Sequence, residues 1–392
     1  MIVYYSIFTY TCLISYFGCY LYRRKLANGP QIDDDAYLVK AEKSISLFWA
    51  LVSVALLVFF MGQRSDFNDT QAYIASFNNA SIDNIKDSVF GDTGVESPGF
   101  TLLMTFFKKY ISKDYIAWFT FLAIFQAGAI VSIYYRYSCN YSMSMYLFIA
   151  STTFIWMESG LRQFTAVCLI LYFLNYVIDR KLVGFAIVVL LAYTIHDTAI
   201  LWIPVYFIIG FKPFSKQIWF FVGLTVVAFF FITEFTSFLD SSLEGTDYEG
   251  YGSIMTNYDP DHTGQVDNGV NPVRALISAV PPAIALWRWK YIKDRTNPLI
   301  DKCINMGTAA AGVNLLGVVT SGILVGRIPI YFTPVNFIVI PWLMKYAFVG
   351  KLQKFMIGAT YILYFAYFLY DMVYMETGIY ISENLGLNLV FD

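Results

Sequence analysis

Charged residues are scarce in this chain: only 14% of its 392 residues are Asp, Glu, Lys or Arg, and only two are histidine. The remainder is strongly apolar, because 58% of the residues are hydrophobic and 19% are aromatic, and the mean hydropathy is +0.56. A membrane-spanning helix needs about 20 mostly apolar residues, and many such runs fit into this length. We therefore predict a polytopic membrane protein without a soluble domain.

Two further absences narrow the class. The five cysteines have neither the spacing of a metal site nor that of a disulfide framework, so we expect them to pack between helices. No basic residues precede the first apolar run, and Arg23, Arg24 and Lys25 follow it. This order excludes a cleaved signal peptide and predicts a retained anchor with the N terminus outside.

Apolar segments predict an all-α protein of about 12 transmembrane helices, forming one integral membrane domain over 1–392. The predicted spans are 2–22, 45–62, 115–135, 142–157, 162–179, 182–196, 197–211, 217–236, 272–289, 299–322, 329–347 and 355–374. The segment 97–110 is apolar but short, and we interpret it as a helix on the outer surface.

The distribution of Lys and Arg decides the topology, because these residues prefer cytoplasmic loops. With 97–110 on the outer surface, 18 of the 26 basic residues lie inside. If 97–110 spanned the membrane, this bias would collapse. Both termini are then outside, and two long outer loops follow, 63–114 and 237–271. Four arginines remain at the outer ends of predicted spans: Arg64, Arg162, Arg274 and Arg327.

Gly62 to Tyr73, "GQRSDFNDTQAY", is the first stretch that can carry chemistry. An arginine fork such as that of Arg64 matches phosphate oxygens bidentately. Asp66 or Asp69 could act as a general base toward a hydroxyl. The alternative is a solvated loop in which the arginine and the aspartates pair with one another.

Other stretches place ionisable residues at the same face. Glu158 and Arg162 in "WMESGLRQFTA" form either an i,i+4 ion pair or a site for a polar headgroup. His196 interrupts an apolar run at a tight outer turn, where it is either a turn residue or a functional group that Asp197 orients.

The last two stretches lie late in the chain. Arg327 lies between Gly326 and Pro329, where a broken helix is tolerated if the backbone lines a cavity, and the alternative is a snorkelling arginine. The segment 259–269 imitates the start of an EF-hand loop but lacks its bidentate glutamate, so we expect no calcium site. Several outer cations together predict an anionic, lipid-embedded substrate such as a polyprenyl phosphate or pyrophosphate.

These stretches, in this order, resemble the EpsG-type, Wzy-like family of bacterial polysaccharide polymerases over roughly 45–350. The family shows an Arg with an Asp-rich segment and a Tyr, a Glu before Gly-Phe, an Arg-Gln pair, a His turn and a late Arg before Tyr-Phe. The residues that match here are Arg64, Asp69 and Tyr73, Glu96 in "ESPGFTLL", Arg162 and Gln163, His196, and Arg327 in "GRIPIYF". Asp66 and Asp69 are both candidates for the family's aspartate. The first outer loop also resembles that of GT-C membrane glycosyltransferases.

The resemblance implies an enzyme of the bacterial cytoplasmic membrane that joins polyprenyl-pyrophosphate-linked oligosaccharide repeats at the outer face. O-antigen, capsule or exopolysaccharide would be the product. The implied catalytic candidates are Asp69, Asp66, His196 and Glu158, and the implied substrate-binding candidates are Arg64, Arg162, Arg327, Gln163, Tyr73, Glu96 and Arg274.

The implied partners are the lipid-linked substrates and the bilayer, with a chain-length regulator and a flippase of the same pathway as candidates. We expect no metal, no cofactor and no nucleic acid. Two alternatives use the same kind of site. One is a ligase or single-sugar transferase with a lipid-phosphate donor, and the other is a carrier that moves a lipid-linked sugar without chemistry.

Overall fold

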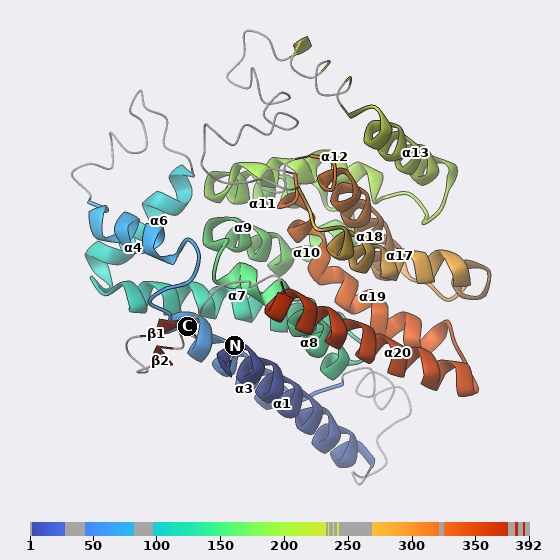
Figure 1. The fold of residues 1–392 in the computed structure, drawn as a ribbon, viewed down its shortest axis with the longest axis horizontal. Coiled ribbons are helices and arrows are strands. Elements are labelled where there is room, and N and C mark those ends of the chain that lie inside the picture. The colour runs from blue at the N-terminus through green and yellow to red at the C-terminus, as the bar shows by residue number, and fades with distance from the viewer. Residues whose placement is uncertain are drawn as a thin grey trace. The chain divides into compact units, whose positions relative to one another are not determined.

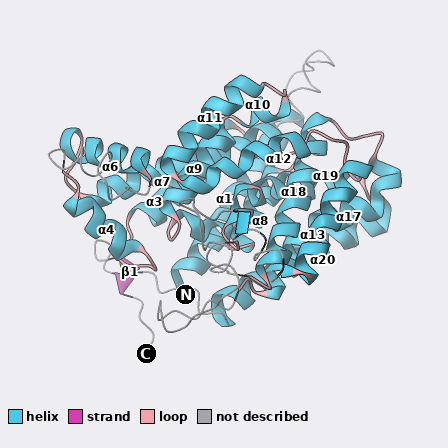
Figure 2. Cartoon of the chain, turned by 90° about the horizontal axis from the view of Figure 1, so that it is seen from above, coloured by secondary structure: helices cyan, strands magenta, loops and turns pink. Residues whose placement is uncertain are grey.

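The computed structural model describes residues 2–27, 44–81, 97–232, 269–320 and 325–374, with short pieces at 234, 238, 241–242, 381–382 and 387–388. These residues are almost entirely helical (Figure 2), which confirms the all-α prediction. Within the described residues, strands are limited to β1 (Ile381–Ser382) and β2 (Leu387–Asn388), an antiparallel pair of two residues each.

The chain divides into two compact units, which we describe separately: Met1–Ile203 with Ile340–Asp392, and Pro204–Val339. The first unit holds α1 (Ile2–Ala27), α3 (Leu47–Gly62), α4 (Thr70–Asn79), α6 (Pro98–Tyr110), α7 (Tyr115–Tyr137), α8 (Tyr141–Ala150), η1 (Thr153–Met157), α9 (Leu161–Tyr172), α10 (Leu174–Ile178), α11 (Leu182–Ile195), η2 (Asp197–Leu201), α20 (Gly350–Leu369) and η4 (Tyr370–Tyr374). The second holds α13 (Lys216–Phe230), α17 (Pro272–Ile292), α18 (Pro298–Gly317) and η3 (Ile328–Tyr331), while α12 (Trp202–Ile208) and α19 (Thr333–Tyr346) begin in one unit and end in the other.

The helices of the first unit pack in a chain of neighbours. α1 packs against α3 and α8, α3 against α7, α7 against α9, and α9 against α11. The short helices α4 and α6 pack on α7 (Figure 1). Local sequence sets the helix starts, since Asp114 caps α7 by accepting from the Ile116 amide at 2.9 Å and Asn140 caps α8 through the Met143 amide at 3.3 Å.

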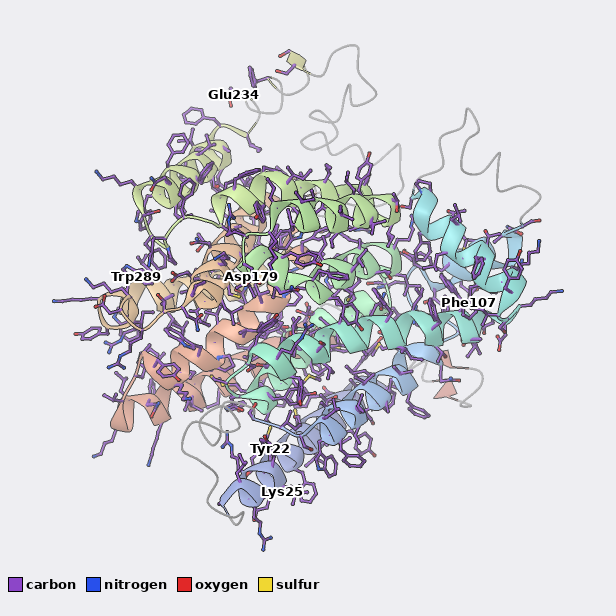
Figure 3. All side chains as sticks on the ribbon, turned by 180° about the vertical axis from the view of Figure 1, so that it is seen from behind. Tyr22, Lys25, Phe107, Asp179, Glu234 and Trp289 are labelled. Carbon is purple, nitrogen blue, oxygen red and sulfur yellow. The ribbon has the colours of Figure 1, made fainter. Side chains whose placement is uncertain are left out.

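Some residues that the charge bias assigned to opposite sides of the membrane lie far apart in the first unit. Tyr22 and Lys25 lie together near the end of α1, away from Phe107 on α6 (Figure 3). The Arg136 guanidinium donates to the Tyr172 carbonyl at 3.5 Å, joining the ends of α7 and α9. This grouping is the one that the predicted topology requires, and the side of the membrane stays a prediction.

Several predicted spans are broken helices. The segment 142–157 forms α8 and then η1, with Thr152 between them at a left-handed φ of 57°. The segment 162–179 forms α9 and α10, which separate at Phe173. Thr152 is buried, and buried protein surroundings are where irregular backbone is tolerated at membrane depth.

The count of twelve spans is not confirmed. Among the described helices, Tyr115–Tyr137 and Gly350–Val373 are long and apolar enough to cross a membrane, and six others are apolar but only 10–17 residues long. Large apolar side chains nevertheless face outward, for example Phe48 at 66% exposure and Ile362 at 72%. Extensive exposed apolar surface is typical of contact with lipid or with another protein.

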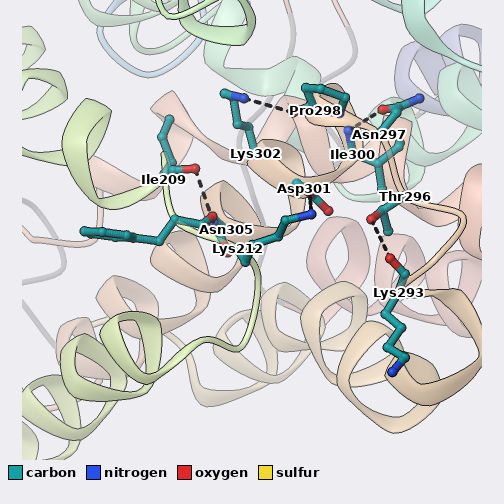
Figure 4. A network of polar contacts seen from close by, with 11 residues as sticks. Ile209, Lys212, Lys293, Thr296, Asn297, Pro298, Ile300, Asp301, Lys302 and Asn305 are labelled. Atoms are coloured by element: carbon teal, nitrogen blue, oxygen red, sulfur yellow. Dashed lines mark hydrogen bonds and ion pairs between the residues drawn. The ribbon is translucent and has the colours of Figure 1, made fainter.

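The second unit is built on the helix pair α17 and α18, with α13 packed against α18. Asn297 caps α18 by accepting from the Ile300 amide at 2.9 Å (Figure 4). One helical turn further on, Asn305 donates to the Phe211 carbonyl at 2.8 Å and to the Ile209 carbonyl at 3.2 Å. Lys212 lies 3.8 Å from the Asp301 carboxylate. These polar contacts attach the connection after α12 to the start of α18.

Candidate active site

The stretch from Gly62 to Tyr73 folds into a compact turn between α3 and α4. α3 ends at Gly62, where an added side chain would lie 3.0 Å from the Thr120 Cα on α7. Asn68 has a left-handed φ of 42°, a conformation for which asparagine is enriched. The Gln71 amide donates to the Ser65 carbonyl at 3.0 Å, which closes the turn. The close approach at Gly62 and this turn bring Arg64 against α7.

Arg64 is fully buried at 0% exposure. Its Nε donates to Thr70 Oγ1 at 3.3 Å, and its Nη1 donates to the Met61 carbonyl. The guanidinium carbon lies 4.4 Å from the centre of the Phe119 ring, the geometry of a cation–π contact. The arginine predicted to meet a phosphate at the surface is therefore a charge held inside the protein.

Glu158 is the buried carboxylate of the same region, also at 0% exposure. Its Oε2 accepts a hydrogen bond from the Tyr4 hydroxyl at 3.3 Å, and its Oε1 accepts none from the described residues. Burial raises the pKa of Glu158 to about 7, while the positive charge of Arg64 and the Tyr4 hydrogen bond act in the opposite direction. The structure thus pairs Glu158 electrostatically with Arg64.

Arg162, Tyr73 and Asp69 form a second, more accessible group. The Arg162 guanidinium lies within hydrogen-bonding reach of the Tyr73 hydroxyl. Burial raises the pKa of Tyr73, Asp69 raises it further, and Arg162 opposes both. Arg162 and Tyr73 are half-buried, whereas Asp69, at the N-cap of α4, is exposed. Asp66 is half-buried in the turn that precedes α4.

An apolar cluster holds this group in place. Its buried members come from α4, α6, α7 and α9: Phe77, Phe100, Met104, Phe107, Trp118, Phe119, Leu122 and Leu161. Trp118 is central, with ring centroids 6.2 Å from Phe77 and 5.2 Å from Phe107. The predicted surface helix 97–110 is observed as the helix α6, and its buried face joins this cluster.

His196 lies near the same apolar cluster, because the preceding residue, Ile195, packs against it. Ile195 packs against the cluster that contains Leu161, the residue before Arg162. His196 itself links α11 to η2, with Nδ1 2.7 Å from Thr198 Oγ1 and 3.3 Å from the Asp197 carboxylate. The pairing of His196 with Asp197 matches the interpretation that Asp197 orients the imidazole.

The remaining candidates lie elsewhere. Arg274 and Arg327 belong to the second unit, where Arg274 Nη2 donates to the carbonyl of Gly326, the residue before Arg327, at 3.5 Å. Gln163 is buried in α9. Glu96, most of the loop 237–271 and the EF-hand-like residues 259–268 lie outside the described residues. Within the described part, no group of three or more His, Cys, Asp or Glu side chains could hold a metal ion.

The family model described as EpsG family matches residues 47–384, most of the chain. The chain belongs to the EpsG family. Comparison with curated proteins and with solved structures gave no match.

EpsG membership carries functional meaning at a coarse level. The EpsG family is associated with polysaccharide biosynthesis in membranes and with a polysaccharide-polymerase type of function. Such a function implies lipid-linked oligosaccharides as substrates. The resemblance noted from the sequence motifs is therefore confirmed for the family, and the roles of individual residues stay predictions.

Three residues that contact Glu158 or Arg64 were not predicted from the sequence: Tyr4, Thr70 and Phe119. Tyr4 precedes the region matched by the EpsG model, and nothing local distinguishes it from the other tyrosines of its helix. Phe119 is one aromatic residue of an apolar run. Thr70 follows Asp69 directly, and nothing in the sequence indicates that its side chain is buried and accepts a hydrogen bond from Arg64.

Proposed function

We propose that this EpsG protein polymerises oligosaccharide repeat units carried on polyprenyl pyrophosphate, at the outer face of the bacterial cytoplasmic membrane. The observation that carries the proposal is that Asp69 and Arg162 both lie near Tyr73. Thr70, the residue after Asp69, accepts a hydrogen bond from the buried Arg64, which in turn faces Glu158. An accessible carboxylate and guanidinium beside a buried charged layer suit transfer of a glycosyl group from a phosphate leaving group.

Arg162 is the arginine of the first unit best placed to bind pyrophosphate, because it is half-buried and close to an accessible carboxylate. Its planar fork matches phosphate oxygens. Arg64 contributes positive potential from the interior and need not touch the substrate. Arg274 and Arg327 of the second unit stay predicted substrate-binding residues.

Asp69 is our choice for the general base because it is exposed, whereas Asp66 is half-buried. The hydroxyl oxygen of the accepting lipid-linked repeat attacks the anomeric carbon of the growing glycan. The bond from that carbon to the pyrophosphate oxygen breaks, and the hydroxyl proton moves to the Asp69 carboxylate. The transition state has oxocarbenium character, as in related glycosyl chemistry.

Glu158 acts as a positioning residue for Arg64. The Tyr4 hydroxyl donates a hydrogen bond to the Glu158 carboxyl group, which faces the charge of Arg64. The Glu158 carboxyl group lies where it can balance part of the Arg64 charge. His196 with Asp197, Gln163 and Glu96 stay predicted contributors to the same site.

The length of the glycan made by a deletion strain tests the function. Lipid-linked products of one repeat in the deletion strain, and long chains after complementation, are expected for a polymerase. Long chains that remain unattached in the deletion strain would instead identify a ligase. Internal accumulation of lipid-linked repeats would identify a carrier, and either result would overturn the proposal.

A further inference from the structure

The second unit contains a cavity that the catalytic proposal does not use. It lies among α12, α13, α17 and α18 and has a volume of about 640 Å³, within the range of small-molecule sites. Its walls are almost wholly apolar, with Phe221, Val222, Leu276 and Val313 among them. A cavity of this size and lining suits a hydrocarbon ligand.

The cavity is elongated along the helices. On α13 its lining extends from Ile218 to Phe229, a rise of about 16 Å at 1.5 Å per residue. On α18 it extends from Asn305 to Val318. Small residues line its walls on α17 and α18, namely Ala275, Ala279, Ala309, Ala311 and Gly312. The missing side-chain volume leaves room for a chain that carries methyl branches.

Positive charge lies close to one end of the cavity. Pro272 lines that end and is the first residue of α17. Arg274 is in the same helical turn and donates to the Gly326 carbonyl at 3.5 Å, so that Arg327 follows immediately. At the other end, Asn305 is held by the carbonyl groups of Ile209 and Phe211. A lipid with an apolar tail and an anionic head matches this polarity.

We propose that this cavity binds the polyprenyl chain of the lipid-linked substrate, with its phosphate directed toward Arg274 and Arg327. The proposal rests on the proposed function for the identity of the lipid, and it names the second unit as the place where the tail is held. The branched isoprenoid chain fills the wide apolar slot, and the arginines supply complementary charge at its end.

Photolabelling of the protein in lipid nanodiscs tests the proposal. The probe is a polyprenyl phosphate with a benzophenone on its chain, which carries no sugar and therefore labels without turnover. The test variant is Gly312→Leu, because Gly312 and Thr225 both line the cavity and a Cβ at Gly312 would lie only 3.3 Å from the Thr225 methyl group. The matched control is Gly223→Leu on α13, where an added side chain meets nothing within 4 Å.

We expect labelling of α13, α17 or α18 to fall about tenfold in Gly312→Leu, because overpacking excludes the chain, and to be unchanged in Gly223→Leu. Ala279→Leu fills the cavity from α17 and should give the same loss, which covers the case in which Gly312→Leu does not fold. The proposal is overturned if the folded cavity-filling variants are labelled as strongly as the Gly223→Leu control. It is also overturned if phosphatidylglycerol competes with the probe as well as unlabelled polyprenyl phosphate does. The two proposals can fail separately. If the wild-type protein makes no polymer but filling the cavity still abolishes labelling, the lipid site stands and the proposed function fails.

Discussion

Tyr4 donates a hydrogen bond to Glu158 across 154 positions of the chain. This bond attaches the first turn of α1 to the connection before α9, and both side chains are buried. α1 lies before the region that the family model matches, so a residue outside that region orients a carboxylate within it.

Arg162→Lys should abolish most polymer formation in a well-folded protein. Lysine keeps the positive charge but loses the planar fork that binds phosphate, and loss of one such contact typically lowers the rate by about a hundredfold to a thousandfold. Polymer yield at equal membrane content measures the effect. Arg136→Lys is the control, because Arg136 is exposed at the other end of α7. Polymer within about twofold of wild type would assign Arg162 a structural role.

Arg64→Lys should act differently, through stability. Arg64 is fully buried, and its guanidinium packs 4.4 Å from the Phe119 ring centre while Nε bonds to Thr70. A lysine cannot make both contacts, and disturbing a buried charged network costs on the order of 1–3 kcal/mol. Thermal unfolding in detergent measures the change. A variant with wild-type stability and no activity would instead place Arg64 in direct contact with substrate.

Asp69→Asn should lower the polymerisation rate by about a hundredfold or more, because an amide cannot take the proton from the attacking sugar hydroxyl. Asp66→Asn should retain most activity, since Asp66 is half-buried in the turn while Asp69 is exposed. Initial rates with purified lipid-linked repeats distinguish them. The reverse pattern would assign the base to Asp66, and full activity of both variants would exclude an aspartate base in this loop.

Glu158 should make stability fall as pH rises. Its pKa is raised from 4.5 to about 7, so the folded state binds this proton more tightly than the unfolded state. The resulting stabilisation is complete below pH 4.5 and is lost as pH rises through 7. The loss is on the order of 3 kcal/mol, at 1.36 kcal/mol for each pKa unit. Thermal unfolding between pH 5 and 8 should show a steeper decline for wild type than for Glu158→Gln. Parallel curves would mean that Glu158 does not titrate in this range.

His196→Gln should reduce polymer yield about tenfold or more at equal expression, because glutamine keeps hydrogen bonding but cannot carry the proton. Asp197→Asn should lower activity in the same direction, since the Asp197 carboxylate lies 3.3 Å from the imidazole. Thr198→Ser keeps the hydroxyl beside Nδ1 and serves as the control. Unchanged polymer in His196→Gln would make His196 a turn residue.

Cysteine labelling tests the predicted topology. With the five native cysteines replaced, Ser138→Cys and Lys181→Cys should react with a membrane-impermeant reagent only after the cells are opened. Lys113→Cys, exposed before α7, should react in intact cells. The charge bias and the grouping of helix ends both require this pattern. Labelling of positions 138 and 181 from outside would overturn the topology.

The amino-acid sequence by itself determined that the chain is all-helical and which family it belongs to. These properties depend on apolar runs and on motifs such as "GLRQFTA", which are local in the chain. The helix α6 and the pairing of His196 with Asp197 were predictable for the same reason.

Only the tertiary structure decided which charges face each other. An ion pair between Glu158 and Arg162, four positions apart, is one of two interpretations that the sequence allows. In the structure Glu158 lies with Arg64 and Tyr4, while Arg162 lies with Tyr73. Helix packing chooses these partners, because burial of a charge depends on every element that surrounds it and not on its neighbours in sequence. The break at Thr152 and the cavity beside α13 likewise arise from how helices fit together, which no periodicity records.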